Sequence, residues 1–419
     1  MRLSRRAFLG HAGATSAGLL LYPAAVAESH PQVRTAIPPA TLADTFAYLP
    51  RHFIFEYYPW YSTEPWQHWD AAGRRPPIDI ATNYMPALGA YDSRSTRVIE
   101  QHARWIKQSG AGAINISWWG RGSSSDRAVP DIMDVMADYD IYVTFHIEPY
   151  GRSRASEFAR DVEYLIRNYG QRRRWDCFLL LTNADGRSGP VFKSFSTIEG
   201  SQYTDCHGRT FPIPDWVRDV IWREQIDRIR AMFAADFDHV TLLADCSAVD
   251  RVIDAGFDGM AIYDNWVEPE TWPVHARNFT GGGQLFSFNI NCGFDAVVER
   301  VPPDECYKPP PFAPGRGVYD WSRAEEREAA QRASSARIAE SFAQTIATQT
   351  DPRFTNARRG FFLAYINSFN EWHEGTQFEP MKDRAALSGN ERAIGYHNYD
   401  QGSYRLEQLR DLLASVLQP

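Results

Sequence analysis

Two glutamates stand three residues apart near the C-terminal end of the chain, Glu371 and Glu374 in the stretch 370–374, NEWHE. If the chain turns helically there, residues at i and i+3 project to the same side. Neighbouring carboxyl groups raise the pKa of one member, so one stays protonated as an acid while the other is ionised as a base. The pair is a candidate for general acid and base catalysis, although the same spacing also occurs at a solvated helix start.

Aromatic residues are the unusual feature of the composition. Phe, Trp and Tyr make up 14% of the 419 residues, with 13 Trp and 20 Tyr among them. Trp and Tyr rings stack on the apolar C–H faces of sugars, while Asp, Glu, His and Asn side chains bond their hydroxyl groups. Cleavage of a glycosidic bond requires two carboxyl groups, one as proton donor and one as base or nucleophile. An aromatic surface and paired glutamates together predict a carbohydrate-cleaving site.

Eight short apolar runs, rich in β-branched and aromatic residues, recur along the chain and alternate with helical patterns. This alternation indicates a parallel sheet with crossover helices. Eight units, with no GxGxxG after the first, predict an α/β fold that is a single (β/α)8 TIM barrel with extended βα loops. The expected strands are 53–58, 112–118, 141–146, 177–181, 239–244, 259–263, 285–289 and 361–366.

The residues that follow each expected strand decide where chemistry is possible, because active sites in such barrels lie at the C-terminal strand ends. All eight exits carry polar or aromatic groups. An aromatic pair at a single exit is commonly core packing, but eight coincident exits favour a ligand-binding cup. The exits are 57–61, 118–120, 146–150, 183–185, 245, 263–266, 289–291 and 370–374.

The N-terminal residues have the pattern of an export signal. Arg5 and Arg6 precede a mildly apolar run and a small-x-small pattern at 25–27, which predicts a twin-arginine signal. The alternative, a buried helix or membrane anchor, is disfavoured because the run is shorter than the ~18 to 20 apolar residues of a membrane span. We expect a periplasmic or secreted protein, with the twin-arginine export machinery as a partner and no stable membrane anchor. The predicted organisation is a signal peptide over 1–27, a linker over 28–48 and a catalytic barrel over 49–419.

Charge and cysteine content narrow the class of ligand. Asp and Glu number 52 against 44 Lys and Arg, a net charge of −8, and no basic stripe stands out. A nucleic-acid partner is therefore not expected. The five cysteines form no CxxC or zinc-finger spacing, and their odd number leaves at least one unpaired within the chain. No cofactor is expected.

Four motifs are specific enough to point to one family. They are YYPWY at 57–61, SWWG at 117–120, FHIEPY at 145–150 and SFNEWHEGTQFEP at 368–380. Together they resemble glycoside hydrolase family 99, the endo-α-mannosidases and endo-α-mannanases, over most of the chain from about residue 53. The resemblance implies a (β/α)8 barrel, in agreement with the strand count. It also implies retaining, endo-acting cleavage of internal α-mannosidic bonds without a metal.

The resemblance further implies that the sugar's own 2-hydroxyl, rather than a carboxylate, is the nucleophile. Glu371 would withdraw the 2-hydroxyl proton while that oxygen attacks C1, which forms a 1,2-anhydro sugar. Glu374 would protonate the departing oxygen and later deprotonate the water that opens the epoxide. This route suits α-mannose, whose axial 2-hydroxyl is trans to the axial leaving group.

Nine further residues are expected around the substrate. His146 and Glu148 are two apart in an extended segment, so both can face the lumen, with a structural ion pair as the alternative. The expected set comprises a stacking wall of Tyr58, Trp118 and Trp119, the hydroxyl-binding groups His146, Glu148 and Tyr263, and also Trp60, Asn370 and His373.

Some segments depart from the family pattern. The exit 289–294, NINCGF, is not the Gly-Pro-Gly-Tyr-like run of the family, and 185–214 and 302–314 are expected to be long loops over the site. A barrel glycosidase for another α-glycan or a surface polysaccharide is therefore one alternative. An inactive carbohydrate-binding or polysaccharide-assembly protein is another, but a binding protein has no use for a paired acid and base.

Overall fold

The computed structural model describes residues 40–417 apart from 152–153, 172, 196, 198–199, 214–215, 266 and 298–318. The expected signal peptide lies outside the described residues, as do residues 28–39 of the expected linker. The rest of that linker includes helix α2 (Ala40–Thr45). Leu42 and Phe46 are buried in the main hydrophobic core, and α2 packs against the C-terminal helix α12 (Tyr404–Leu417).

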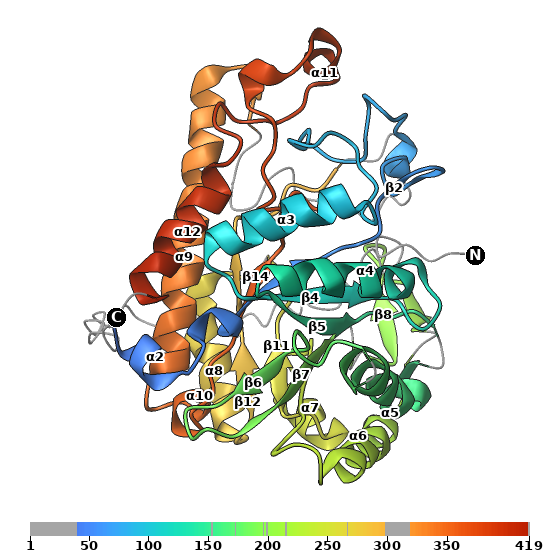
Figure 1. The fold of residues 1–419 in the computed structure, drawn as a ribbon, viewed down its shortest axis with the longest axis vertical. Coiled ribbons are helices and arrows are strands. Elements are labelled where there is room, and N and C mark those ends of the chain that lie inside the picture. The colour runs from blue at the N-terminus through green and yellow to red at the C-terminus, as the bar shows by residue number, and fades with distance from the viewer. Residues whose placement is uncertain are drawn as a thin grey trace.

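Eight parallel strands close into a barrel, so the predicted fold is confirmed (Figure 1). The strand that closes the barrel is bent. It consists of β12 (Leu285–Ser287) and β13 (Asn289–Asn291), with Phe288 between them. β12 pairs with one neighbour, β11, and β13 pairs with the other, β14, so this segment completes the circle. The other strands are β1 (Phe53–Tyr57), β4 (Ala113–Trp118), β5 (Tyr142–Ile147), β7 (Ser188–Ser194), β10 (Thr241–Ala244), β11 (Gly259–Ala261) and β14 (Ala364–Asn367).

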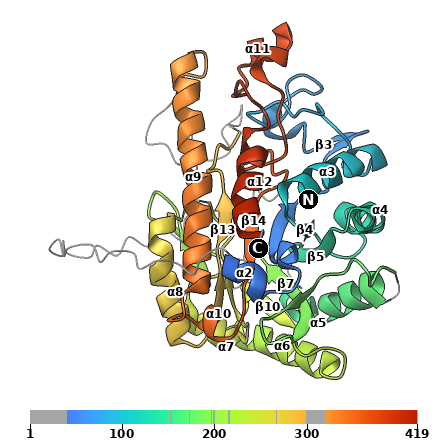
Figure 2. The same cartoon turned by 60° about the vertical axis from the view of Figure 1, so that its left-hand side comes forward.

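Helices surround the barrel, and the long α9 runs beside α12 in both views (Figures 1 and 2). α3 shows why these segments are helical, because Ile99, Ala103 and Ile106 form one buried stripe at spacings of four and three. None of the helices that the structure describes combines the length and apolar character needed to cross a membrane. The helices are α3 (Thr96–Ser109), α4 (Ser124–Asp138), α5 (Arg154–Tyr164), α6 (Asp219–Phe233), α7 (Val249–Ala255), α8 (Trp272–Gly281), α9 (Ala324–Thr350), α10 (Thr355–Arg358) and α11 (Gly389–Ile394).

Side chains alternate along each strand, so every second residue points into the barrel and the others point outward. The inward side chains form two layers. Outward residues such as Phe55 and Ile114 pack under the helices. Inward residues near the strand starts are apolar, whereas inward residues further along are polar and lie under the C-terminal mouth. The apolar layer includes Ile54, Ala113, Val191, Leu243 and Leu363, and the polar layer includes Glu56, Asn115, His146 and Lys193.

The expected fourth strand, 177–181, is wrong. Val143 exchanges backbone hydrogen bonds with Cys177 and Leu179, but the chain then leaves β5 as β6 (Leu180–Thr182), which is antiparallel to β7. β7 is the fourth barrel strand, and the expected exit 183–185 is a turn at the opposite, N-terminal end of the barrel. An apolar run alone does not distinguish a barrel strand from an antiparallel neighbour.

The same correction applies to the expected loop 185–214. It contains β7 itself and a hairpin of β8 (Gln202–Thr204) and β9 (Thr210–Pro212). Likewise the exit 289–294 contains β13, a barrel strand, while the expected loop 302–314 lies outside the described residues. A second hairpin, β2 (Ser62–Thr63) with β3 (Trp66–Gln67), follows β1.

The four cysteines within the described part of the chain divide into two groups. Cys206, between β8 and β9, is disulfide-bonded, whereas Cys177, Cys246 and Cys292 are free thiols. Burial raises the pKa of Cys177 to about 12 and that of Cys246 to about 11. Because the thiolate is the reactive form, these two thiols are mostly un-ionised and weakly nucleophilic at neutral pH.

Candidate active site

The chain leaving β14 forms a tight loop that carries both glutamates. The Ser368 N–H donates to the Thr376 carbonyl (2.9 Å), and the Phe378 N–H donates to the Ser368 carbonyl (2.8 Å), so the loop ends are joined. Gly375 turns the chain with a φ of +65°, and a Cβ there would lie 2.4 Å from the Asp295 carbonyl oxygen. Glycine is therefore required one residue after the second glutamate.

Glu371 is 1% exposed and is held by backbone groups. Its N–H donates to Ser368 Oγ (2.8 Å), and its Oε1 accepts the N–H of His373 (3.1 Å). His373 Nε2 lies 2.9 Å from the His68 carbonyl oxygen, which only accepts, so Nε2 carries a proton. His373 Nδ1 then faces Glu371, 3.8 Å from Oε1.

Glu374 is 7% exposed and has a different neighbour. The Tyr263 hydroxyl, just after β11, donates to Glu374 Oε2 at 2.6 Å. The Glu374 carbonyl accepts the N–H of Asp295, which ties the loop to the segment after β13. The two carboxyl groups are therefore oriented by separate parts of the barrel mouth.

Replacing Tyr263 with phenylalanine is expected to lower kcat/KM of the hydrolase proposed below by roughly 10-fold. A hydrogen bond to a carboxylate contributes about 1.5 kcal/mol, and the phenyl ring keeps the packing against His146 and Phe195. Steady-state kinetics on the purified variant measures the change. An unchanged kcat/KM would show that this hydroxyl does not orient the Glu374 carboxyl group.

A buried polar network supports the middle of the loop. Glu379 Oε2 accepts from the Tyr91 hydroxyl (2.7 Å) and from Trp372 Nε1 (2.9 Å). Glu379 Oε1 lies 3.2 Å from His102 Nε2, and His102 Nδ1 lies 3.0 Å from the Tyr57 hydroxyl. Because Trp372 stands between the two glutamates in the sequence, its hydrogen bond to Glu379 joins this network to the loop that carries both glutamates.

Trp60 is the centre of the aromatic wall beside Glu371. Its ring stacks on His68 (centroids 4.6 Å apart) and on His373 (6.0 Å), and Trp119 lies at 6.3 Å. Tyr58 is fully buried, with its ring 5.0 Å from that of Trp60. Trp119 is partly buried whereas Trp60 and Tyr58 are buried, so Trp119 has more free surface for a sugar than these two rings.

Asn370 joins the first and last strands of the site. Its side chain accepts the N–H of Tyr58 (2.8 Å) and donates to the Tyr58 carbonyl (3.1 Å). The bond pair fixes the YYPWY exit against the loop of the glutamates. In the structure Asn370 therefore organises the wall.

Trp118 does not belong to the wall, which corrects the expectation for this residue. It is fully buried behind β4, and its Nε1 donates to Asp126 Oδ1 on α4 at 2.7 Å. The physical reason is strand alternation, because Asn115 and Ser117 point into the barrel and Trp118 therefore points toward the helices. Of the adjacent tryptophans only Trp119, beyond the strand end, lies at the mouth.

Glu148 and His146 have separate partners. The Ser117 hydroxyl donates to Glu148 Oε1 (2.7 Å) and accepts from Trp119 Nε1 (3.1 Å), which links Glu148 to the wall. His146 instead pairs with Glu56, with Nδ1 2.9 Å from Oε2. The alternative of an ion pair between His146 and Glu148 is thus replaced by a pair that the sequence did not suggest.

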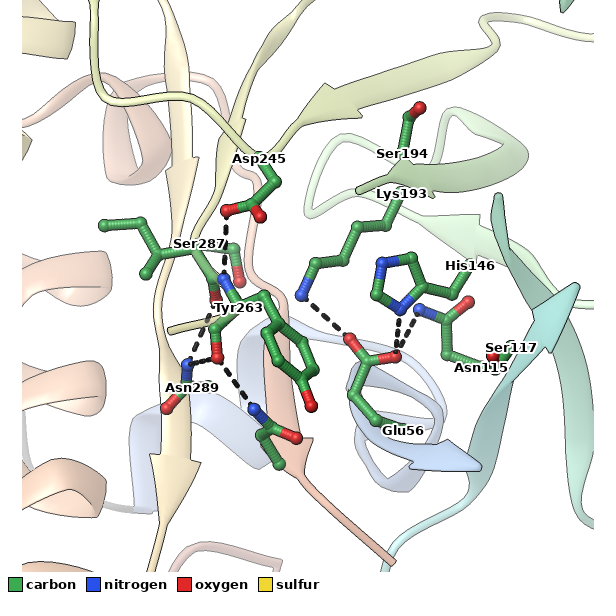
Figure 3. A network of polar contacts seen from close by, with 12 residues as sticks. Glu56, Asn115, Ser117, His146, Lys193, Ser194, Asp245, Tyr263, Ser287 and Asn289 are labelled. Carbon is green, nitrogen blue, oxygen red and sulfur yellow. Dashed lines mark hydrogen bonds and ion pairs between the residues drawn. The ribbon is translucent and has the colours of Figure 1, made fainter. Parts of the chain in front are cut away.

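Glu56 is the centre of a polar network inside the barrel (Figure 3). Its Oε2 accepts from Asn115 Nδ2 (3.0 Å) and lies next to His146 Nδ1, while its Oε1 accepts from Lys193 Nζ (2.8 Å). Burial would raise the pKa of Glu56, but the adjacent His146 and Lys193 outweigh burial and lower it from 4.5 to about 2. Glu56 is therefore ionised at neutral pH.

Sequence reasoning missed Glu56, Asn115 and Lys193. Glu56 and Asn115 lie within apolar runs, where they resembled interruptions of a strand, and Lys193 lies on the strand that was misplaced. The signal was available in the alternation, because each residue occupies an inward position of its strand. A polar residue at an inward position of a barrel strand predicts a contact inside the barrel.

The ionised Glu56 is expected to make stability depend on pH in the acid range. Because its pKa is lower in the folded protein than the usual 4.5, its stabilisation is complete above pH 4.5 and is lost as the pH falls toward 2. The lowering of the Glu56 pKa from 4.5 to about 2 corresponds to about 3 kcal/mol of the free energy of unfolding. Urea unfolding of wild type and Glu56→Gln should give free energies of unfolding that converge by this amount across the range. A gap independent of pH would contradict the ionised state.

Within the residues that the structure describes, no group of three or more His, Cys, Asp or Glu side chains is placed to hold a metal ion. The groups at the mouth that can take part in chemistry include carboxyl groups, imidazoles and aromatic rings. Two buried glutamates beside an aromatic wall can supply an acid, a base and a stacking surface.

Comparison with known proteins gives a family and a set of relatives. The family model of glycosyl hydrolase family 99 matches residues 50–177. A mouse glycoprotein endo-α-1,2-mannosidase-like protein is 27% identical over 353 residues, which cover 77% of this chain and 68% of the relative. Mouse glycoprotein endo-α-1,2-mannosidase is 24% identical over 359 residues, or 77% and 66%. The chain thus spans about two thirds of the length of these relatives.

Solved structures agree in fold. Two structures of the GH99 endo-α-mannosidase from Bacteroides thetaiotaomicron match with TM-scores of 0.57 and 0.59 at 20% and 19% identity. They cover 87% and 88% of this chain, and 97% and 99% of that protein. The chain is therefore a glycoside hydrolase-like barrel that resembles glycosyl hydrolase family 99 in both sequence and fold.

Proposed function

We propose that the protein is a retaining, endo-acting glycoside hydrolase that cleaves internal α-mannosidic bonds, of the endo-α-1,2-mannosidase or mannanase type. The observation that carries the proposal is the tight loop after β14, which holds Glu371 and Glu374 buried at the C-terminal mouth of the barrel, beside the Trp60 wall. The names of the relatives support the substrate class.

In the first step Glu371 acts as the base. It takes the proton of the substrate 2-hydroxyl, and O2 attacks C1 to form the C1–O2 bond of a 1,2-anhydro sugar. The bond from C1 to the departing oxygen breaks, and Glu374 gives its proton to that oxygen. The N–H donated by His373 to Glu371 favours the ionised carboxylate that this step needs.

In the second step Glu374 acts as the base. It takes a proton from water, whose oxygen attacks C1, and the C1–O2 bond of the epoxide breaks. Glu371 returns the proton to O2. Two inversions at C1 give net retention of the α configuration, without a carboxylate bonded to the sugar.

The other mouth residues bind the substrate in this proposal. Trp119 and Trp60 stack on a sugar face, as the contact of Trp60 with His373 and that of Trp119 with Trp60 support. Glu148 and His146 bond hydroxyl groups. Tyr263 orients the carboxyl group of Glu374.

A different α-glycan remains the second candidate for the substrate. The observation that favours it is the NINCGF exit of the bent strand, where Asn289 Nδ2 donates to the carbonyls of Ile262 and Tyr263. Asn289 thus supports the β11 exit. The same two glutamates would then act on another sugar.

Product analysis tests the proposal. The purified protein is incubated with a panel of α-mannans and α-glucans, and the products are identified by mass spectrometry and NMR. Release of α-configured manno-oligosaccharides supports the proposal. Cleavage of another polymer alone moves the substrate to the second candidate, and no cleavage of any polymer favours the carbohydrate-binding alternative.

We also propose that the protein is exported by the twin-arginine pathway to the periplasm or medium. Replacing Arg5 and Arg6 together by lysine is expected to trap the protein in the cytoplasm, because the receptor reads this pair. Cell fractionation and immunoblotting measure the distribution. Arg2→Lys is the matched control, and normal export of the double variant would contradict the pathway.

A further inference from the structure

We infer that Glu56 and Lys193 are positioning residues that fix the tautomer of His146. In this arrangement Nδ1 carries the proton and donates to Glu56, while Nε2 stays unprotonated and accepts a hydrogen bond from a sugar hydroxyl. The inference rests on the proposed function for the identity of the ligand. The tautomer itself is a property of the protein alone.

The three side chains are completely buried and come from three strands, β1, β5 and β7. Glu56 lies between the other two, with one oxygen on Lys193 Nζ (2.8 Å) and the other on His146 Nδ1 (2.9 Å), as Figure 3 shows. A carboxylate oxygen only accepts hydrogen bonds, so the proton between it and His146 belongs to Nδ1.

Lys193 is the second charged partner of Glu56. The ammonium group already neutralises Glu56, and its other neighbours are the ring faces of Tyr263 and Tyr365, at 5.3 and 4.6 Å. A second cation on His146 would leave a net positive charge inside the barrel, which burial disfavours. In the arrangement that we infer, the second nitrogen of His146 keeps a free electron pair.

The second ring nitrogen of His146, Nε2, is buried and contacts no polar partner among the described residues. The ring packs between Phe195 (5.8 Å) and Tyr263 (5.9 Å), and the Tyr263 hydroxyl bonds Glu374. A buried polar atom without a partner costs free energy, which a substrate hydroxyl beside Glu374 would recover.

Nitrogen-15 NMR of the histidine rings at about pH 7 tests the tautomer directly. We expect His146 to show a protonated Nδ1 and an unprotonated Nε2. His52 is an internal control for a neutral ring in an intact fold, because burial lowers its pKa to about 4. An Nε2–H tautomer, or a doubly protonated ring, in wild-type His146 would overturn the inference.

Variants test the cause. In Glu56→Gln the amide also donates, so the second tautomer should appear, and in Lys193→Met the unbalanced Glu56 should draw a proton onto His146. Ser287→Ala is the matched control, since it removes a hydroxyl of the same layer that bonds the Leu363 carbonyl (2.8 Å) and should leave His146 unchanged. Unchanged His146 signals in both network variants, with intact His52 signals, would contradict the assigned roles.

Kinetics adds a readout that a purely structural role would not give. Both network variants should raise KM for the cleaved glycan by roughly 10- to 100-fold, with a smaller change in kcat, because a hydroxyl contact is lost. If either variant lost activity only in proportion to its loss of folded protein, with an unchanged KM, the inference would be contradicted. If no glycan is cleaved, the proposed function fails while the nitrogen-15 spectra still decide the tautomer.

Discussion

Replacing Glu374 or Glu371 with glutamine is expected to lower kcat of the proposed hydrolysis by roughly 100- to 10,000-fold, the usual contribution of a general acid or base. Glutamine has the size of glutamate, and its carbonyl oxygen can still accept from Tyr263 at position 374 and from the His373 N–H at position 371. It neither gives nor takes the proton. Substrate affinity, measured by calorimetry, should therefore remain close to that of the wild type.

An activated leaving group separates the two roles. A substrate with an aryl leaving group needs no proton donor, so it should restore the first step in Glu374→Gln but not in Glu371→Gln, which lacks the base. Glu391→Gln is the matched control, because Glu391 is a buried glutamate that caps α11 and contacts Lys382 outside the mouth. Normal turnover of either site variant would remove that residue from the mechanism.

The barrel was predictable because its strands are apolar runs of regular spacing, and seven of the expected runs are barrel strands. The eighth failed at residues 177–181, where an apolar run is followed by a sharp reversal and the true strand, β7, has Gly189 and Pro190 directly after its first residue. These residues are poor strand formers, so local sequence preference gave the wrong strand. Pairing with β5 and β10, which is not a local property, determines the outcome.

The site was predictable where a motif is continuous and was missed where it is assembled across strands. The NEWHE loop brings Glu371, His373 and Glu374 to the mouth within one segment. The Glu56 network instead joins residues 90 and 137 positions apart. Such contacts depend on which strands become neighbours, and a single sequence without the correct fourth strand does not provide that information.

Trp118 and Trp119 are adjacent in the sequence but lie in different surroundings, so we expect their replacement to have different effects. Trp118→Ala is expected to lower the free energy of unfolding by about 3 to 5 kcal/mol, the usual cost of removing a buried tryptophan. The indole fills the space between β4 and α4, contacts the rings of Tyr150 (5.7 Å) and Tyr164 (6.2 Å), and donates to Asp126. Its loss leaves a cavity and a weakened polar contact far from the glutamates.

Trp119→Ala should behave in the opposite way, because its ring is partly exposed at the mouth beside Trp60. We expect a small change in stability and a weaker affinity for the glycan, since stacking stabilises the bound and transition states alike. Urea unfolding with an unchanged m-value, together with calorimetric titration of both variants, separates the two effects. If Trp118→Ala kept its stability and lost affinity, the wall would include Trp118, and the inward direction of Ser117 in β4 would be wrong.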